Sequence, residues 1–232
     1  MWQELCKTRE EYLERAKLDT KGYSPRRSET LLYEIARLDG MDIKKQDFFN
    51  ILNDIEISPK VTREDTHRIK DLSNAFLYLV KCAQQRKRFS LDFIRDVSAK
   101  VMQHTGKEVY TTIGGYDTSL GDFLLGEEYY EEGILANYAQ IPDMLEQLCK
   151  ETNEKLGNVH DILTVKLAAD FHYRFMHIKP FGAGNITVGL LMMNYIQMMF
   201  REPLILIPGE DKAKYLAAIK MQKDTPTPET FE

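Results

Sequence analysis

Apolar residues recur at helical spacing along most of the chain. Between residues 62 and 85 they form one stripe, which consists of Ile69, Leu72, Ala75, Phe76, Leu79 and Val80. Positions three and four residues apart share one face of a helix, so this stripe predicts a long amphipathic helix that packs against a core. The same spacing predicts further helices at residues 2–18, 28–38, 44–55, 90–104, 141–156, 159–175, 187–199 and 211–221. The chain is therefore predicted to be mainly α-helical.

One segment, residues 106–133, departs from this pattern. It is rich in Tyr, Thr and Gly, it is punctuated by turn residues, and its apolar residues lose their helical spacing. Such a composition favours short strands joined by turns. We expect a small β-hairpin or loop insert here.

The composition is that of a folded protein with a single core. Of the 232 residues, 43% are hydrophobic and 29% are charged, which is too apolar for a disordered chain. No Pro-, Gly- or Ser-rich stretch divides the sequence. The formal net charge is -5 and the two signs are interspersed, so no basic face is expected to bind a phosphate backbone. Nucleic acid is therefore not an expected partner.

The three cysteines, Cys6, Cys82 and Cys149, lie far apart in the sequence. They form no CxxC pair and their number is odd, unlike a disulfide framework. The first residues include acids where a secretion signal would be basic and then apolar, and no later run reaches membrane-spanning length. We expect a cytoplasmic protein with no membrane partner.

The segment with the most chemical information is residues 171–194, FHYRFMHIKPFGAGNITVGLLMMN. Its pattern places His177 at the end of one helix and a Gly-rich turn before the next. Backbone N–H groups in such a turn and at a helix N-terminus point outward, and the helix dipole favours phosphate oxygens there. Asn185 could cap the second helix or contact a phosphate, and His177 could accept a proton as a general base. An ordinary interface histidine followed by an ordinary turn is the alternative interpretation.

This combination resembles the signature of the Fic (Fic/Fido domain) family in its Bacteroides-like form: a His, then Pro-Phe, two residues, Gly-Asn-Gly-Arg, two residues and a second Arg. Here residues 177–190 read HIKPFGAGNITVGL, and the flanking FHYRF and LLMMNYI look like the family's helices around its active loop. The resemblance implies a Fic-type helical bundle with a small β-hairpin flap. It divides the chain into an N-terminal helical extension at 1–60, a Fic domain at 61–221 and a frayed tail at 222–232.

Proteins of this family usually transfer AMP from ATP to a Ser, Thr or Tyr hydroxyl of a target protein, with Mg2+ bridging the phosphates. The resemblance implies that His177 deprotonates the target hydroxyl. It also implies that phosphate oxygens are held by Gly182, Gly184 and Asn185. The glycines and the asparagine of the turn match the signature.

The metal position departs from the signature, because Ala183 stands where the family has an acidic Mg2+ ligand. An alanine cannot bind a cation that prefers carboxylate or carbonyl oxygens. The family implies ATP and Mg2+ as cofactors, but Ala183 argues against them here, and no metal ligand is assigned. A carboxylate from elsewhere, Asp122 or Glu210, is the alternative.

Three further motif positions are altered. Thr187 and Leu190 replace the two phosphate-binding arginines, and each charged hydrogen bond lost is worth roughly 1.5–3 kcal/mol. Ile186 replaces a glycine, is expected to reshape the pocket, and resists φ > 0 if the turn requires it. Ordinary AMP transfer is therefore expected to be weak or absent.

Many family members also carry an inhibitory helix, with Ser or Thr, three residues, Glu, then Gly or Asn, whose Glu pairs with the second motif arginine. Residues 35–40, IARLDG, are the best match, with Asp39 and Gly40 at its last two positions. The hydroxyl is missing, and the partner position holds Leu190. Either the helix is kept for packing after the ion pair was lost, or it is an unrelated helix end with Gly40 as its left-handed cap.

Three functions remain open. The first is a divergent transferase that uses His177 with a phosphate donor bound in another way. The second is a pseudoenzyme, in which a target or regulatory protein docks at the insert, residues 106–138. The third is a helical oligomerisation domain that forms a homo-oligomer. Exposed apolar residues at 204–207 would support this function.

Overall fold

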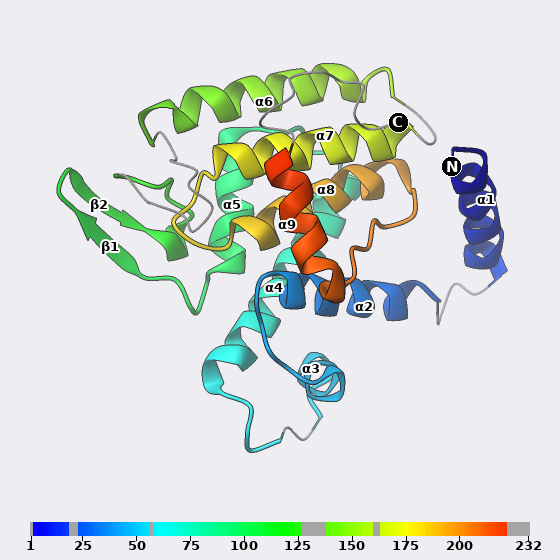
Figure 1. Cartoon of the computed structure of the whole chain (residues 1–232), viewed down its shortest axis with the longest axis horizontal. Helices are drawn as coiled ribbons and strands as arrows, with labels where there is room; N and C mark the ends of the chain where they lie inside the picture. Colours follow the sequence, from blue (N-terminus) through cyan, green and yellow to red (C-terminus); the bar gives the residue numbers. More distant parts are fainter. Residues whose placement is uncertain (1, 19–22, 56–57, 127–137, 160–162, 222–232) are drawn as a thin grey trace.

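The computed structural model describes residues 2–18, 23–55, 58–126, 138–159 and 163–221 (Figure 1). In these ranges the helices are, in chain order, α1 (Trp2–Leu18), α2 (Tyr23–Leu38), α3 (Lys45–Leu52), α4 (Arg63–Gln84), α5 (Leu91–Val101), α6 (Ile141–Leu156), α7 (Leu163–Ile178), α8 (Asn185–Phe200) and α9 (Lys212–Met221). The strands described are β1 (Glu108–Thr111) and β2 (Gly114–Asp117), and the short 3-10 helices are η1 (Thr118–Leu120), η2 (Tyr138–Gln140) and η3 (Gly209–Asp211). The prediction of a helical bundle with a small hairpin is confirmed.

Helix α8 lies at the centre of the bundle, where it packs against α7, α4, α5 and α2 (Figure 1). Its sequence is apolar on nearly every side, and such a helix is stable only when it is buried all round. Tyr195 is fully buried, with its ring centroid 5.4 Å from that of Phe89 and 5.0 Å from that of Phe93. The predicted helix at 187–199 is confirmed, and it is the central one.

Side-chain caps set the starts of two helices, and a buried acid sets the end of one. Thr62 forms a reciprocal capping box at the start of α4, and Ser90 caps α5. Helix α5 ends at Val101, three residues earlier than expected. The backbone N–H of His104 donates instead to the fully buried carboxylate of Asp71 (2.8 Å), so this residue leaves the helical ladder.

Other helix ends also differ from the prediction. Helix α2 begins at Tyr23, five residues early, and α3 ends at Leu52, soon before Asp54 adopts a left-handed φ of 55°. Helix α7 continues to Ile178, and α8 begins at Asn185. The predicted helix pair around the Gly-rich turn is therefore closer together in sequence than expected.

The hairpin pairs β1 with β2 in antiparallel register, with Val109 opposite Tyr116 and Thr111 opposite Gly114. It projects from the bundle beside α5 (Figure 1). Tyr116 is buried, whereas Tyr110 is 76% exposed. The predicted hairpin is confirmed in this part of the insert, and residues 127–137 of the insert lie outside the described residues.

The end of α2 is a tight left-handed turn. Gly40 has a φ of 93°, and the N–H of Met41 donates to the Ala36 carbonyl (2.9 Å), as in a Schellman-type cap. Gly40 thus forms the left-handed cap that one of the two interpretations of residues 35–40 predicted. The turn holds Asp39 directly after the last residue of the helix.

Helices α2 and α3 pack on the bundle, through α8 and α4 respectively. Helix α1 is attached by a two-pronged ion pair, in which Arg9 Nε and Nη2 lie 2.6 and 2.5 Å from the Glu202 carboxylate. The division of the chain at residue 60 stays a prediction, and the tail at 222–232 lies outside the described residues. No helix in the described ranges has the length and apolar character needed to cross a membrane.

Candidate functional site

The turn between α7 and α8, residues 179–184, is held on the core by its own aromatic residue. Phe181 is buried, with its ring centroid 5.7 Å from that of Phe123. The backbone N–H of Leu124 donates to the Pro180 carbonyl (2.8 Å), so the chain that follows the hairpin is also joined to the turn. The turn is therefore anchored from two sides.

Asn185 fixes the shape of the turn. Its Oδ1 accepts from the Phe181 N–H (3.1 Å), and its Nδ2 donates to the Phe181 carbonyl (2.6 Å). Gly184 is the N-cap of α8, with a φ of 74° that favours glycine, and it supplies no side-chain cap. The first amides of α8 thus receive no cap from Gly184. A phosphate contact by Gly182, Gly184 or Asn185 stays a prediction.

Three altered motif positions, Ile186, Thr187 and Leu190, lie inside α8. Ile186 is within the helix, and the left-handed φ of the turn falls on Gly184, so the β-branched side chain meets no backbone strain. The strain expected at Ile186 is absent for this reason. Leu190 is buried in the core with 2% of its surface exposed, one helical turn further along.

A pocket of about 210 Å³ lies between α2, α4, α5 and the start of α8. Its lining includes the motif residues Ala183, Gly184 and Thr187. Its charged lining residues are Asp39, Glu64 and Arg68. The motif positions that reach this pocket therefore carry no charge, and its charged groups come from α4 and the end of α2.

Asp39 and Arg68 form an ion pair at this pocket, with Arg68 Nη2 3.2 Å from Asp39 Oδ2. Burial raises the pKa of the Asp39 carboxyl above its usual value. The charge of Arg68 opposes this rise, as do side-chain hydrogen bonds from Thr187 and Arg68 and the charge of Lys212. Asp39 therefore has an ion-pair partner, on α4 and not at motif position 190. An inhibitory role for Asp39 and Gly40 stays a prediction.

His177 lies in the last turn of α7. Its Nδ1 is 2.9 Å from the Tyr173 carbonyl, which only accepts hydrogen bonds, so Nδ1 carries a proton and donates it. Its Nε2 is buried and has no hydrogen-bond partner among the described residues. His177 is not among the residues that line this pocket, and its role as a general base stays a prediction.

A second histidine of α7, His172, joins this helix to α9. It is buried, and its Nε2 lies 3.0 Å from the Tyr215 hydroxyl oxygen. Burial lowers the pKa of His172 to about 4. The ring is therefore neutral at neutral pH and has a structural part in the core.

The hairpin touches the Gly-rich turn. A Cβ atom at Gly182 would overlap the hydroxyl and ring of Tyr116 on β2. Only glycine leaves room for this contact. The insert thus packs on the motif turn through one aromatic side chain.

The carboxylates that could replace the missing metal ligand are elsewhere. Asp122 accepts from Arg95 (2.7 Å), Glu210 lies in η3, and neither lines the pocket. In the described part of the chain, no group of three His, Cys, Asp or Glu side chains is placed to hold a metal ion. The motif position itself offers Mg2+ only the methyl group of Ala183. The loss of ATP and Mg2+ as cofactors stays a prediction.

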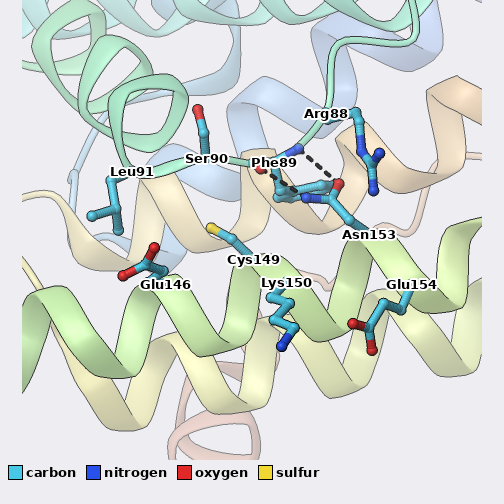
Figure 2. A pocket seen from close by; sticks show the side chains of 9 residues that line it. All are labelled: Arg88, Phe89, Ser90, Leu91, Glu146, Cys149, Lys150, Asn153 and Glu154. Atoms are coloured by element: carbon cyan, nitrogen blue, oxygen red, sulfur yellow. Dashed lines mark hydrogen bonds between the residues drawn. The ribbon is translucent and has the colours of Figure 1, made fainter.

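A larger pocket, of about 350 Å³, lies between the start of α5 and α6, away from the motif turn (Figure 2). Figure 2 shows Asn153 of α6 joined to the backbone of Phe89 by two hydrogen bonds, of 3.0 and 2.8 Å. Cys149 lines the same pocket, but burial raises the pKa of its thiol to about 12. A thiol of that pKa is not a nucleophile at neutral pH.

Arg68 is the residue of this site that the sequence analysis missed. No motif contains it, and its one signal is its place beside the apolar stripe of α4, one position before the buried Ile69. It enters the pocket because α4 passes both the end of α2 and the start of α8.

Comparison with known sequences finds one family. Residues 88–197 match the model of the Fic/DOC family. The protein adenylyltransferase Fic of Drosophila erecta is 23% identical over 162 residues, which is 69% of this chain and 30% of that protein. The protein of the same name from Drosophila virilis is 35% identical over 60 residues, or 26% of this chain and 12% of that protein. The chain spans less than a third of the length of these curated relatives.

Solved structures share the fold. A Fic domain containing signaling protein from Bacteroides thetaiotaomicron aligns with a TM-score of 0.71 at 21% identity, over 85% of this chain and 72% of that one. Fic-1 from C. elegans aligns with a TM-score of 0.72 at 17% identity, over 94% of this chain and 64% of that one. At these identities the likeness concerns the fold alone.

Proposed function

Residues 88–197 of this chain are a Fic/DOC domain, and from that premise we propose that AMP transfer by this domain is weak or absent and that the domain works as a protein-binding module. The observation that carries the proposal is the pocket beside the motif turn. Its motif residues are Ala183, Gly184 and Thr187, which bring neither a carboxylate for a metal ion nor an arginine for phosphates.

The histidine supports the same proposal. The signature has its His directly before Pro-Phe, where this chain has Lys179, and His177 lies two residues earlier. Lys179 is buried and has a left-handed φ of 45°. A lysine in that place does not supply the imidazole on which the signature's proton transfer relies.

Partner binding is assigned to the insert. Tyr110, Ile113 and Leu120 are large apolar residues on and beside the hairpin, and 76, 50 and 64% of their surfaces are exposed. Apolar side chains gathered on one exposed element are typical of a protein-binding surface. The chain's partner is therefore proposed to be a target or regulatory protein that docks on the insert.

The test is a transfer assay with labelled ATP and Mg2+, on the parent and on the variant Ala183→Asp with Thr187→Arg. Leu190 stays unchanged, because an arginine there would be buried in the core. We expect no label transfer by the parent. Efficient, Mg2+-dependent labelling of a protein hydroxyl by the parent would overturn the proposal.

A divergent transferase is the second candidate, and one observation favours it. The Nδ1 of His177 donates to the Tyr173 carbonyl, so Nε2 is the ring atom left to accept a proton, and this buried atom would have to be uncovered to reach a target hydroxyl. If the parent transfers label, His177→Ala must abolish the activity while the far-ultraviolet circular dichroism stays unchanged. Activity that survives in His177→Ala would exclude this histidine from the reaction.

An oligomerisation domain has less support. The run Leu204–Ile207 is only partly exposed and packs against the core. The Asn194 side chain binds both the N–H and the carbonyl of Ile205, at 2.8 and 3.1 Å, and so fixes this run on α8. The apolar run therefore stabilises the fold of the single chain.

A further inference from the structure

We propose that His67 and His104 together bind a first-row transition-metal ion such as Zn2+, and that the buried Asp71 carboxylate orients His104 for this purpose. His67 is in α4, and His104 lies between the end of α5 and the start of β1. A metal ion on both rings would therefore join α4 to the segment that leads into the hairpin. The site is independent of the proposed function, and neither histidine lines the pocket beside the motif turn.

The two histidine rings already lie at the separation that a shared ion requires. Their centroids are 5.2 Å apart, with 44° between the ring planes. Two imidazoles on one tetrahedral Zn2+ have centroids about 5 Å apart, because each ring centre lies about 3 Å from the metal. His67 and His104 can therefore meet one ion without a movement of either backbone segment.

Asp71 fixes the ring of His104. Its carboxylate is fully buried, and it accepts from the backbone N–H of His104 at 2.8 Å and from Nδ1 of the same residue at 2.6 Å. A carboxylate accepts, so Nδ1 donates the proton and the lone pair of the neutral ring is on Nε2. Histidines that bind a metal usually donate their other ring N–H to a carboxylate or a carbonyl in this way.

The buried charge of Asp71 favours a cation at His104. Within the described ranges, both hydrogen bonds of this carboxylate come from His104. The neighbouring bases on α4, Arg68 and Lys70, are ion-paired with Asp39 and Asp54. Buried charges are normally paired or close to a metal ion. An ion on the far nitrogen of the His104 ring would compensate the charge of Asp71 through that ring.

Solvent reaches both rings. The side chain of His104 is 48% exposed, and His67 is half-buried. The two histidines supply two ligands, and water would complete the coordination, since the described residues place no group of three His, Cys, Asp or Glu side chains to hold a metal. An open site of this kind is expected to bind its ion reversibly.

The ligand atoms determine which metals can bind. Imidazole nitrogen suits Zn2+, Ni2+ and Cu2+, and the tightest binding is expected for Cu2+. Mg2+ and Ca2+ prefer oxygen ligands and should not bind here. The site therefore differs in its chemistry from the Mg2+ site that the signature implies.

The experiment is calorimetric titration of the untagged, metal-free full chain with Zn2+, Ni2+ and Mg2+. The proteins are the parent, His67→Asn, His104→Asn and Asp71→Asn. The matched control is His160→Asn, which removes a histidine remote in the sequence. Circular dichroism checks that each variant is folded.

We expect the parent to bind one Zn2+ per chain and no Mg2+. His67→Asn and His104→Asn should each weaken Zn2+ binding by at least about 10-fold, while His160→Asn should leave it unchanged. Zn2+ should also slow hydrogen exchange of residues 102–107 in the parent but not in His67→Asn, because only an ion shared by both rings joins this segment to α4.

Asp71→Asn tests the orienting carboxylate separately. It should weaken Zn2+ binding by about 10- to 100-fold and leave the stoichiometry at one ion per chain. If this variant does not fold, nitrogen NMR of the histidine rings in the parent gives the same information. Nδ1 of His104 should carry the proton, and Zn2+ should shift the resonance of Nε2. A shift at Nδ1 instead would overturn the role of Asp71.

Two results would overturn the metal site: no Zn2+ binding by the parent, or the affinity of the parent in a folded His67→Asn or His104→Asn variant. Either result leaves the proposed function intact, because that proposal is tested by label transfer and not by metal binding at these histidines. Conversely, AMP transfer by the parent would overturn the proposed function whatever the titrations with Zn2+ show.

Discussion

Arg68 reaches from the middle of α4 to the carboxylate of Asp39, 3.2 Å away, and this contact joins the end of α2 to the pocket beside the motif turn. The pair is partly buried, and the pKa of Asp39 is raised in spite of its positive partner. The cost of burying the Asp39 carboxylate thus exceeds the attraction of the Arg68 charge. The charged form of Asp39 is therefore expected to destabilise the folded protein.

Asp39→Asn should stabilise the fold at neutral pH. The folded-state pKa of Asp39 lies above the unfolded value of 3.8, so its contribution to stability is present below pH 3.8 and is lost as the pH rises through the folded pKa. Removing the charge should raise the free energy of unfolding and the melting temperature at pH 7. Thermal unfolding at pH 7 measures this, with Asp42→Asn as the control.

Arg68→Gln should have the opposite effect. It leaves the Asp39 carboxylate without its charged partner, and an unpaired, partly buried acceptor costs about 1–3 kcal/mol. Urea unfolding at pH 7 should show the loss, and the double variant with Asp39→Asn should recover most of it. A double variant no more stable than Arg68→Gln alone would argue against coupling between the two side chains.

His172 should make the fold sensitive to mild acid. Its pKa is lowered from 6.5 to about 4, so the unfolded chain binds more protons between these values, and stability falls as the pH drops from 6.5 towards 4. The full loss is about 3 kcal/mol. Urea unfolding at pH 7 and pH 5 should show a smaller pH dependence for His172→Gln than for the parent. Equal pH dependence in the two proteins would mean that His172 is not the group that titrates.

Asn185→Ala should release the motif turn. The variant leaves the N–H and the carbonyl of Phe181 without their partner, which costs about 2–3 kcal/mol. Hydrogen exchange of residues 179–184 should become faster. Asn153→Ala is the matched control, because Asn153 binds the backbone of Phe89 in the same two-pronged way but far from the turn. Its loss should leave exchange in the turn unchanged.

Gly182→Ala should push the hairpin away from the turn. The added methyl group overlaps the hydroxyl and ring of Tyr116, and overpacking of this kind costs about 1–3 kcal/mol. Tyr116→Phe removes the oxygen nearest to that methyl group, so the double variant should regain part of the stability. Thermal unfolding of the two single variants and the double variant gives the coupling energy. A coupling near zero would show that the methyl group is accommodated elsewhere.

The helices could be predicted from the sequence wherever local patterns decide them. The stripe from Ile69 to Val80 and the cap at Thr62 define α4 within its own sequence, and the uniformly apolar α8 has no stable place except the centre. The end of α5 could not be predicted in this way, because it depends on Asp71, which is 33 residues from His104 along the chain.

The site was less predictable than the fold. The motif turn, its glycines and its altered positions are local and were found. The pocket depends on Arg68 and Asp39, which meet across 29 residues of sequence and belong to no motif. The position of His177 in the last turn of α7 depends on where that helix ends, and sequence patterns fix helix ends poorly.

The residues that line the pocket lie on both sides of residue 88, where the match to the family begins. Asp39 and Arg68 precede this residue, while Gly184 and Thr187 lie within the match. A recombination event that moved residues 88–197 alone into another gene would carry the motif turn but leave both charged walls behind. The pocket is therefore complete only where α2 and α4 accompany the matched segment.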